Sequence, residues 1–95
     1  MSARYLVLVA YDIADPRRLQ RVARALEEIG ERVQKSVFEC GVTPDGLIAL
    51  RERLRALIDP REDRVLLQPL CPHCRHAMVW QGKPPPITTE AFWVI

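Results

Sequence analysis

Asp12 is the first side chain in this sequence whose type and position could do chemistry. It ends an apolar, β-branched run and precedes a helix start, which places its carboxylate at the exposed end of a predicted strand. Mg²⁺ takes oxygen ligands and keeps several waters, so one or two carboxylates can hold it. A single aspartate is too few within a monomer and is more simply a capping or solvated residue. Two copies of Asp12 facing each other across a symmetric dimer would supply the second ligand.

Arginines on the helix that follows form a second candidate site. Asp15 and Pro16 predict the start of this helix, because a capping carboxylate is followed by proline at the first helical position. Four arginines fall on it: Arg17, Arg18, Arg21 and Arg24. The first, third and fourth share one face, from which guanidinium groups could contact successive phosphates. The same face could instead be solvated and paired with nearby glutamates, and the residues alone favour neither interpretation. These glutamates are Glu27, Glu28 and Glu31.

A third candidate is the segment of residues 33–39. Lys35 and Ser36 could contact phosphate, and Phe38 could stack on a base. For Phe38, packing in the core is the simpler interpretation. Ser36 has no acid or base partner at a spacing typical of a catalytic triad, so nucleophilic serine chemistry is not expected.

A fourth candidate is the cluster Cys71-Pro-His-Cys74-Arg-His76. Two thiols two residues apart can bind a tetrahedral zinc ion, with a histidine as third ligand. No second pair follows at zinc-finger spacing, and Cys40 is the only other cysteine. A redox dithiol needs its pair at a helix start near a parallel βαβ unit, whereas this pair is predicted to follow a strand into a loop. We therefore predict reduced structural thiols and no bound zinc.

Hydrophobic periodicity predicts the elements that position these residues. We expect a strand over 5–12, a helix from Asp15 to a stop at Gly30, one bent strand or a tight hairpin over 32–40, a helix from Thr43 to Pro60, a strand over 64–70, a loop over 71–76 and a short strand over 77–80. Pro69 suggests an edge strand or a bulge. This order predicts an α+β fold, a ferredoxin-like βαββαβ sandwich with an additional C-terminal strand and two helices on one face of an antiparallel sheet.

Residues 83–95 differ in composition from the rest of the chain, because three prolines follow Lys83 and the segment ends in an apolar run. We expect a ferredoxin-like domain over residues 1–82 and a proline-led interaction segment over residues 83–95. Lys83-Pro-Pro-Pro86 is a stiff spacer. The apolar, β-prone run at residues 91–95 is predicted to pair as a strand with another chain.

Length and composition bound the function class. A chain of 95 residues and 10.9 kDa forms one domain. No apolar run approaches the roughly 20 residues of a membrane span. The net charge of +2 is modest, although 12 of the 14 basic residues are arginine, whose planar fork matches phosphate. Three cysteines are an odd number, which argues against a disulfide framework and favours a reducing, cytoplasmic compartment.

Two motifs at this distance from each other resemble a known family. Residues 6–13, Leu-Val-Leu-Val-Ala-Tyr-Asp-Ile, precede Asp15-Pro16, and a basic helix then leads to Gly-Glu-Arg-Val-Gln-Lys-Ser-Val-Phe-Glu-Cys over residues 30–40. Together they closely resemble the Cas2 family of CRISPR-associated proteins. Asp63, the Leu70–Cys74 turn and Gly82 look like that family too, so the resemblance spans about residues 5–82.

This resemblance implies a fold, partners and a metal-dependent activity. Members are ferredoxin-like homodimers whose C-terminal strand often crosses to the partner subunit. They lie between two dimers of the Cas1 integrase in the spacer-adaptation complex, where they cradle duplex DNA. Several are described as Mg²⁺-dependent endonucleases that cut single-stranded RNA or double-stranded DNA. The resemblance makes Asp12 the metal ligand. Other positions tied to activity or nucleic-acid contact match Tyr11, Arg21, Arg32, Ser36 and Phe38.

Two other functions remain open from the sequence. One is a toxin-type ribonuclease of the virulence-associated D kind on the same fold. The other is a regulatory ferredoxin-like module that binds a small ligand or metal and no nucleic acid.

Overall fold

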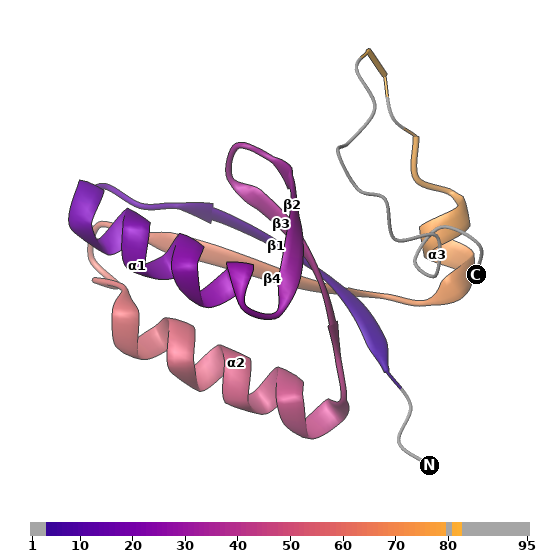
Figure 1. The fold of residues 1–95 in the computed structure, drawn as a ribbon, viewed down its shortest axis with the longest axis horizontal. Coiled ribbons are helices and arrows are strands. Elements are labelled where there is room, and N and C mark those ends of the chain that lie inside the picture. Colours follow the sequence, from indigo (N-terminus) through magenta and orange to yellow (C-terminus); the bar gives the residue numbers. More distant parts are fainter. Residues whose placement is uncertain (1–3, 80, 83–95) are drawn as a thin grey trace.

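One antiparallel sheet covered by two helices makes up the fold. The computed structural model describes residues 4–79, 81 and 82. The sheet has the strand order β2-β3-β1-β4. The elements along the chain are β1 (Tyr5–Asp12), α1 (Pro16–Glu27), β2 (Gly30–Gln34), β3 (Val37–Val42), α2 (Pro44–Leu57), β4 (Arg64–Leu70) and α3 (Pro72–His76). α1 and α2 lie side by side on one face of the sheet (Figure 1). The predicted ferredoxin-like arrangement is confirmed, and residues 83–95 lie outside the described part.

Both long helices begin at the caps that the sequence predicts. The Asp15 carboxylate accepts hydrogen bonds from the amides of Arg17 and Arg18, each at 3.0 Å. The Thr43 hydroxyl accepts one from the amide of Gly46 at 3.1 Å. A proline follows each cap, where its missing N–H costs nothing.

The core lies between the sheet and the two helices. Alternate residues of the central strands point into it, as the period of two along a strand requires. Its fully buried members include Val7, Val9, Val22, Leu26, Phe38 and Cys40. The other residues of the central strands therefore point to the opposite face, which we call the open face.

The open face carries both apolar and polar side chains. Ladder pairing places Leu8 between Glu39 and Gln68, and Ala10 between Val37 and Leu66. Leu66 is 58% exposed there. Pro69 lies in β4, which is an edge strand, as the sequence predicts.

The segment of residues 32–40 is a tight hairpin and not one bent strand. β2 pairs with β3 and shifts register between Arg32 and Gln34. Lys35 and Ser36 form the turn, and the Ser36 carbonyl accepts a hydrogen bond from the amide of Tyr11 at 3.1 Å. The turn is thereby attached to the end of β1.

Gly30 does not stop a helix, because α1 ends at Glu27 and is capped by Glu28. Gly30 is the first residue of β2, where a Cβ atom would overlap the Glu39 carbonyl and lie 2.6 Å from the Cys40 sulfur. Close approach of β2 to β3, and not helix termination, explains the glycine.

The chain after β4 also differs from the prediction. Residues 72–76 form the short helix α3 and not a loop, since Pro72 is suited to a first helical position. The described residues 77–79 of the expected final strand are not a strand, because the Ala77 amide closes α3 on the carbonyls of His73 and Cys74 at 3.2 Å each. None of the helices in the described part of the chain is long and apolar enough to cross a membrane.

Candidate nucleic-acid interface and metal ligand

Asp12 is exposed at the carboxyl end of β1, as its position in the sequence predicts. Its partner in the β1–β4 ladder is Arg64, the first residue of β4. Both line a surface hollow of 260 Å³ whose other lining residues are Ala10, Tyr11, Val65 and Leu66. The hollow is thus flanked by a guanidinium group, which could bind a phosphate, and by a carboxylate, which could bind a metal ion.

The loop after Asp12 is held by a buried carboxylate. Asp63 accepts hydrogen bonds from the amides of Ala14 at 2.9 Å and Asp59 at 2.8 Å. Arg18 donates to the same carboxylate through Nε at 2.8 Å and Nη2 at 3.3 Å. The Arg18 hydrogen bond, with the two amides, holds the pKa of Asp63 well below its ordinary value. Asp63 therefore ties the start of α1 to the loop before β4.

Asp12 itself enters none of the hydrogen bonds or ion pairs found among the described residues. Its oxygens are the hard ligands that Mg²⁺ prefers. In residues 4–79, 81 and 82, no group of three or more histidine, cysteine or acidic side chains could hold a metal. Asp12 is therefore a single candidate ligand among the described residues, and a metal site there would need further ligands, for example from a second copy.

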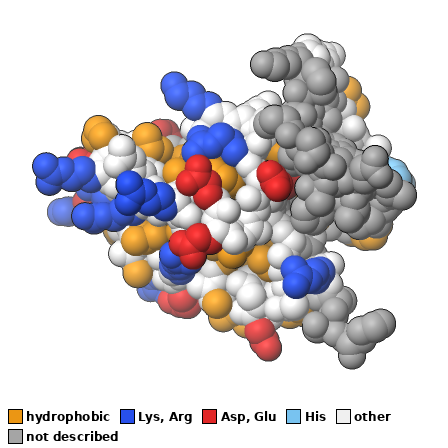
Figure 2. Space-filling model, in the orientation of Figure 1, with side chains coloured by type: hydrophobic (Ala, Val, Ile, Leu, Met, Phe, Trp, Pro, Cys, Tyr) orange, Lys and Arg blue, Asp and Glu red, His pale blue; other side chains and the backbone are white. Residues whose placement is uncertain are grey.

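The predicted arginine face is free of acidic partners. Arg17, Arg21 and Arg24 are exposed and take part in no ion pair within the described part of the chain. Figure 2 shows basic side chains gathered at the left end of the molecule, where α1 begins in Figure 1. This observation favours the phosphate-contact interpretation over a paired, solvated face.

Two of the glutamates considered as partners of the α1 arginines form ion pairs with arginines outside α1. Glu28 pairs with Arg53 of α2 at 3.0 Å. Glu27 lies 3.7 Å from Arg32 of β2. Arg18 differs from its neighbours on α1, because Asp63 and the Glu62 carboxylate, at 3.1 Å, engage it.

Arg32 secures the β2–β3 hairpin. Its Nη1 donates to the Lys35 carbonyl at 2.6 Å, and its guanidinium lies 4.9 Å from the centre of the Phe38 ring. Arg32 is still partly exposed, so contact with a phosphate stays a prediction. Lys35 is exposed in the turn, and Ser36 is half-buried beside it.

Two predicted contact residues lie in the core. Phe38 is fully buried and stacks on Tyr11 at a ring distance of 6.2 Å. A buried ring has no free face for a base, so the prediction that Phe38 stacks on nucleic acid is wrong for this structure, and its core alternative is what we observe. Tyr11 is 6% exposed and lines the hollow beside Asp12, so little of its surface is open to a ligand there.

Sequence reasoning missed Arg64. The residue follows Asp63 and opens a strand, which marks it as exposed but gives it no partner. Only the antiparallel register of β1 and β4 places it opposite Asp12. The fold class alone could have indicated this pairing, because it makes the first and last strands antiparallel neighbours.

The comparison with protein families matches most of the chain. The family described as CRISPR associated protein Cas2 covers residues 5–78. A protein of Synechocystis sp., CRISPR-associated endoribonuclease Cas2 3, is 40% identical over 81 residues, 85% of this chain and 88% of that protein. A protein of Chloroflexus aurantiacus, CRISPR-associated endoribonuclease Cas2 1, is 38% identical over 90 residues, 93% of this chain and 97% of that protein.

Solved structures with a similar fold include two that are more than 30% identical to this chain. Cas2 of Streptococcus pyogenes at pH 6.5 superposes with a TM-score of 0.73 and 35% identity, over 81% of this chain and 99% of that one. A hypothetical protein of Thermus thermophilus superposes with a TM-score of 0.77 and 36% identity, over 90% of this chain and 98% of that one.

Proposed function

This chain belongs to the CRISPR-associated protein Cas2 family, and on that premise we propose that it acts as a homodimer that binds duplex DNA together with a Cas1 integrase during spacer acquisition. We propose in addition a Mg²⁺-dependent endonuclease activity at Asp12, on single-stranded RNA or double-stranded DNA. The observation that carries the binding role is the row of exposed arginines without acidic partners on α1: Arg17, Arg21 and Arg24.

The open face supports the dimer. Leu8, Ala10 and Leu66 form an apolar strip there, and Leu66 is 58% exposed. Leu8 and Ala10 are half-buried beside it, and a second copy of the chain packed on this strip would bury all three side chains. Asp12 continues the same strip at the end of β1. A twofold axis through this face would bring the two Asp12 side chains toward one another.

The chemistry of the donors supports a hard cation. Two Asp12 carboxylates supply oxygen ligands, and a bound Mg²⁺ would polarise a phosphoryl oxygen and activate a water molecule. Arg64 lies opposite Asp12 in the ladder, where its charge can hold a phosphate in the hollow. Asp63 keeps the loop between Asp12 and α1 in place. The endoribonuclease names of the relatives favour RNA as one substrate of this site.

The binding role is tested by duplex affinity over a salt series, for single Arg→Gln variants at positions 17, 21 and 24. Each lost phosphate contact lowers the slope of log affinity against log salt by about 0.9. Arg53→Gln is the matched control, because Glu28 already engages that exposed arginine on α2. An unchanged slope for all three α1 variants would contradict the proposal and return these residues to a solvated face.

The partner is tested separately. A tagged chain co-expressed with the Cas1 integrase of the same genome should retain it on purification at moderate salt. Absence of a complex, with and without duplex DNA, would reject the scaffold role and leave the nuclease proposal to stand on its own assay.

A further inference from the structure

Two exposed thiols lie side by side at the start of α3. The sulfur atoms of Cys71 and Cys74 are 3.2 Å apart. The Cys74 amide also donates a hydrogen bond to the Cys71 sulfur at 3.3 Å. The turn of α3 brings the pair together, and both side chains are exposed to solvent. The role proposed for nucleic acid leaves this pair without a function.

The two thiols have different electrostatic surroundings. Hydrogen bonds from the amide and the thiol of Cys74 lower the pKa of Cys71. The hydrogen bond to Cys71, and the negative charge there, raise the pKa of Cys74. Cys71 is therefore the more acidic of the two thiols and the better placed to act as the nucleophile, while Cys74 reacts in a second step.

We propose that Cys71 and Cys74 are a redox pair that closes reversibly to an intramolecular disulfide by exchange with a low-molecular-weight disulfide. The Cys71 thiolate attacks one sulfur of that disulfide, whose S–S bond breaks and releases one thiolate. Cys74 then gives up its proton and attacks the Cys71 sulfur, which releases the second thiol. The protein loses two electrons and two protons, and the small disulfide gains them.

The ligand set favours this chemistry over zinc. A structural zinc site needs four ligands in a tetrahedral arrangement, and Cys71 and Cys74 supply two. Within the part of the chain that the structure describes, no third ligand joins the pair. A transient, exchangeable disulfide is also the kind that reducing compartments allow.

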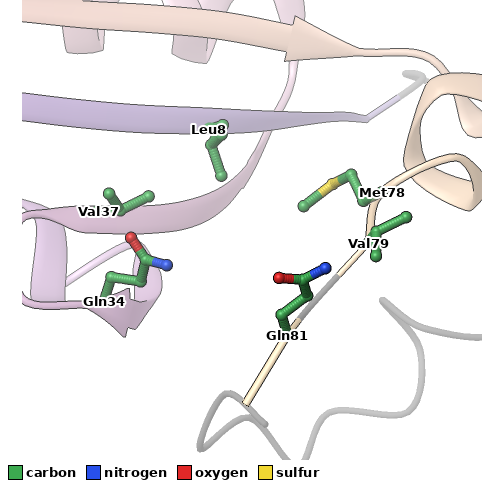
Figure 3. A pocket seen from close by; sticks show the side chains of 6 residues that line it. All are labelled: Leu8, Gln34, Val37, Met78, Val79 and Gln81. Carbon is green, nitrogen blue, oxygen red and sulfur yellow. The ribbon is translucent and has the colours of Figure 1, made fainter. Parts of the chain in front are cut away.

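The position of the pair gives the disulfide a structural consequence. α3 links β4 to Met78 and Val79, which face Leu8 and Val37 across a hollow of 560 Å³ on the open face (Figure 3). A bond between Cys71 and Cys74 would fix the turn from which this segment leaves the sheet.

The experiment equilibrates the full chain with reduced and oxidised glutathione at several ratios, traps it with acid and alkylates it in denaturant. Mass spectrometry then counts the alkylated thiols. We expect loss of two of the three thiols and of two hydrogen atoms. Cys40 does not react with oxidised glutathione in the folded protein, because burial, and the charge of Glu39, raise its pKa to about 12. It therefore remains a free thiol that is alkylated once the chain is denatured.

Stoichiometry separates an intramolecular disulfide from simple glutathionylation. The ratio of disulfide to dithiol should fall about 100-fold for a tenfold rise in reduced glutathione at constant oxidised glutathione, whereas a mixed disulfide falls about tenfold. Cys74→Ser should trap glutathione on Cys71, and Cys71→Ser should react far more slowly. Both positions are exposed, so both variants should fold, which near-ultraviolet circular dichroism checks.

Three results would overturn the proposal. One is three alkylatable thiols at every glutathione ratio. Another is a disulfide that joins two chains on a non-reducing gel. The last is about one zinc per chain by elemental analysis of protein purified without chelator, lost in Cys71→Ser.

Discussion

The carboxylate of Asp63 accepts a hydrogen bond from the amide of Ala14 at 2.9 Å, across 49 positions of the sequence. Ala14 lies two residues after Asp12, and Asp63 immediately precedes Arg64. One buried carboxylate therefore positions both residues that flank the hollow at the end of β1. Asp63 is a positioning residue, whereas Asp12 is the exposed candidate ligand.

We expect Asp63→Asn to destabilise the protein. Both oxygens of Asp63 accept hydrogen bonds, from Ala14, Asp59 and Arg18. The NH₂ group of asparagine would face donors whichever way the amide is turned, and Arg18 would lose its counter-charge. The melting temperature should fall by roughly 5 °C or more, by differential scanning calorimetry. Glu62→Gln is the control, since its exposed contact with Arg18 contributes little.

The hydrogen bonds between Asp63 and Arg18 also predict that the stability of the protein depends on pH. The pKa of Asp63 is lower in the folded protein than its ordinary value of 3.8. Its stabilisation is therefore complete above about pH 4 and is lost as the pH falls toward the folded-state pKa. The stabilities of wild type and Asp63→Asn should converge in acid. A difference that persists unchanged from pH 7 to pH 2 would contradict this assignment.

Asp12→Asn should abolish Mg²⁺-dependent cleavage. Loss of a ligand charge at the proposed metal site should reduce the cleavage rate at least ~10²-fold. Dimer mass and duplex affinity should stay near wild type, because no hydrogen bond or ion pair of the described residues depends on this carboxylate. Cleavage of labelled RNA and DNA substrates is the measurement, and Asp45→Asn, on the first turn of α2, controls for a change in charge. Full activity in Asp12→Asn, in preparations free of contaminating nuclease, would show that Asp12 is not the metal ligand.

Local signals in the sequence were sufficient for much of the fold. Asp15 and Thr43 cap their helices with nearby amides, so a short stretch of sequence determines each helix start. The strand ends at Asp12 and Arg64 follow from apolar runs of the right length. The exposed arginines of α1 were predicted for the same reason, since helical spacing alone puts them on one face.

What the sequence could not supply are the long-range pairings. The register that sets Arg64 opposite Asp12 depends on how β1 and β4 align. The capture of Arg18 by Asp63, across 45 positions, removes one arginine from the basic face. The short helix α3 escaped prediction because five residues carry no periodicity, and its formation is what brings Cys71 and Cys74 together.

Gly30→Ala should destabilise the hairpin. A Cβ atom at this position would overlap the backbone of Glu39 and press on the Cys40 sulfur, both in β3. Such overpacking costs about 1–3 kcal/mol of unfolding free energy, measured by urea titration. In Gly46→Ala the nearest atom, the Thr43 hydroxyl, is 3.2 Å away, and the higher helix propensity of alanine offsets the contact. Equal stability of the two variants would disprove the close approach of β2 and β3.

Removal of residues 87–95 should weaken assembly. This segment lies outside the described residues, and its apolar, β-prone end is expected from the sequence to pair with another chain. The truncated chain should show a lower dimer mass at micromolar dilution or fail to co-purify with the Cas1 integrase. A truncated chain that keeps both properties makes the segment a passive tail.

Leu66→Asp should weaken the homodimer while leaving the monomer folded. Leu66 is 58% exposed on the open face, so the isolated chain tolerates a charge there, whereas an interface would bury it without a partner. Ile48→Asp is a closely matched control, because Ile48 is 59% exposed on α2, which lies on the opposite face of the sheet. Sedimentation equilibrium should show a dimer dissociation constant at least tenfold higher for Leu66→Asp, about 1.4 kcal/mol. If both variants dimerise like wild type, the two Asp12 carboxylates do not meet across the open face, and the metal site must draw its further ligands from nucleic acid or from another protein.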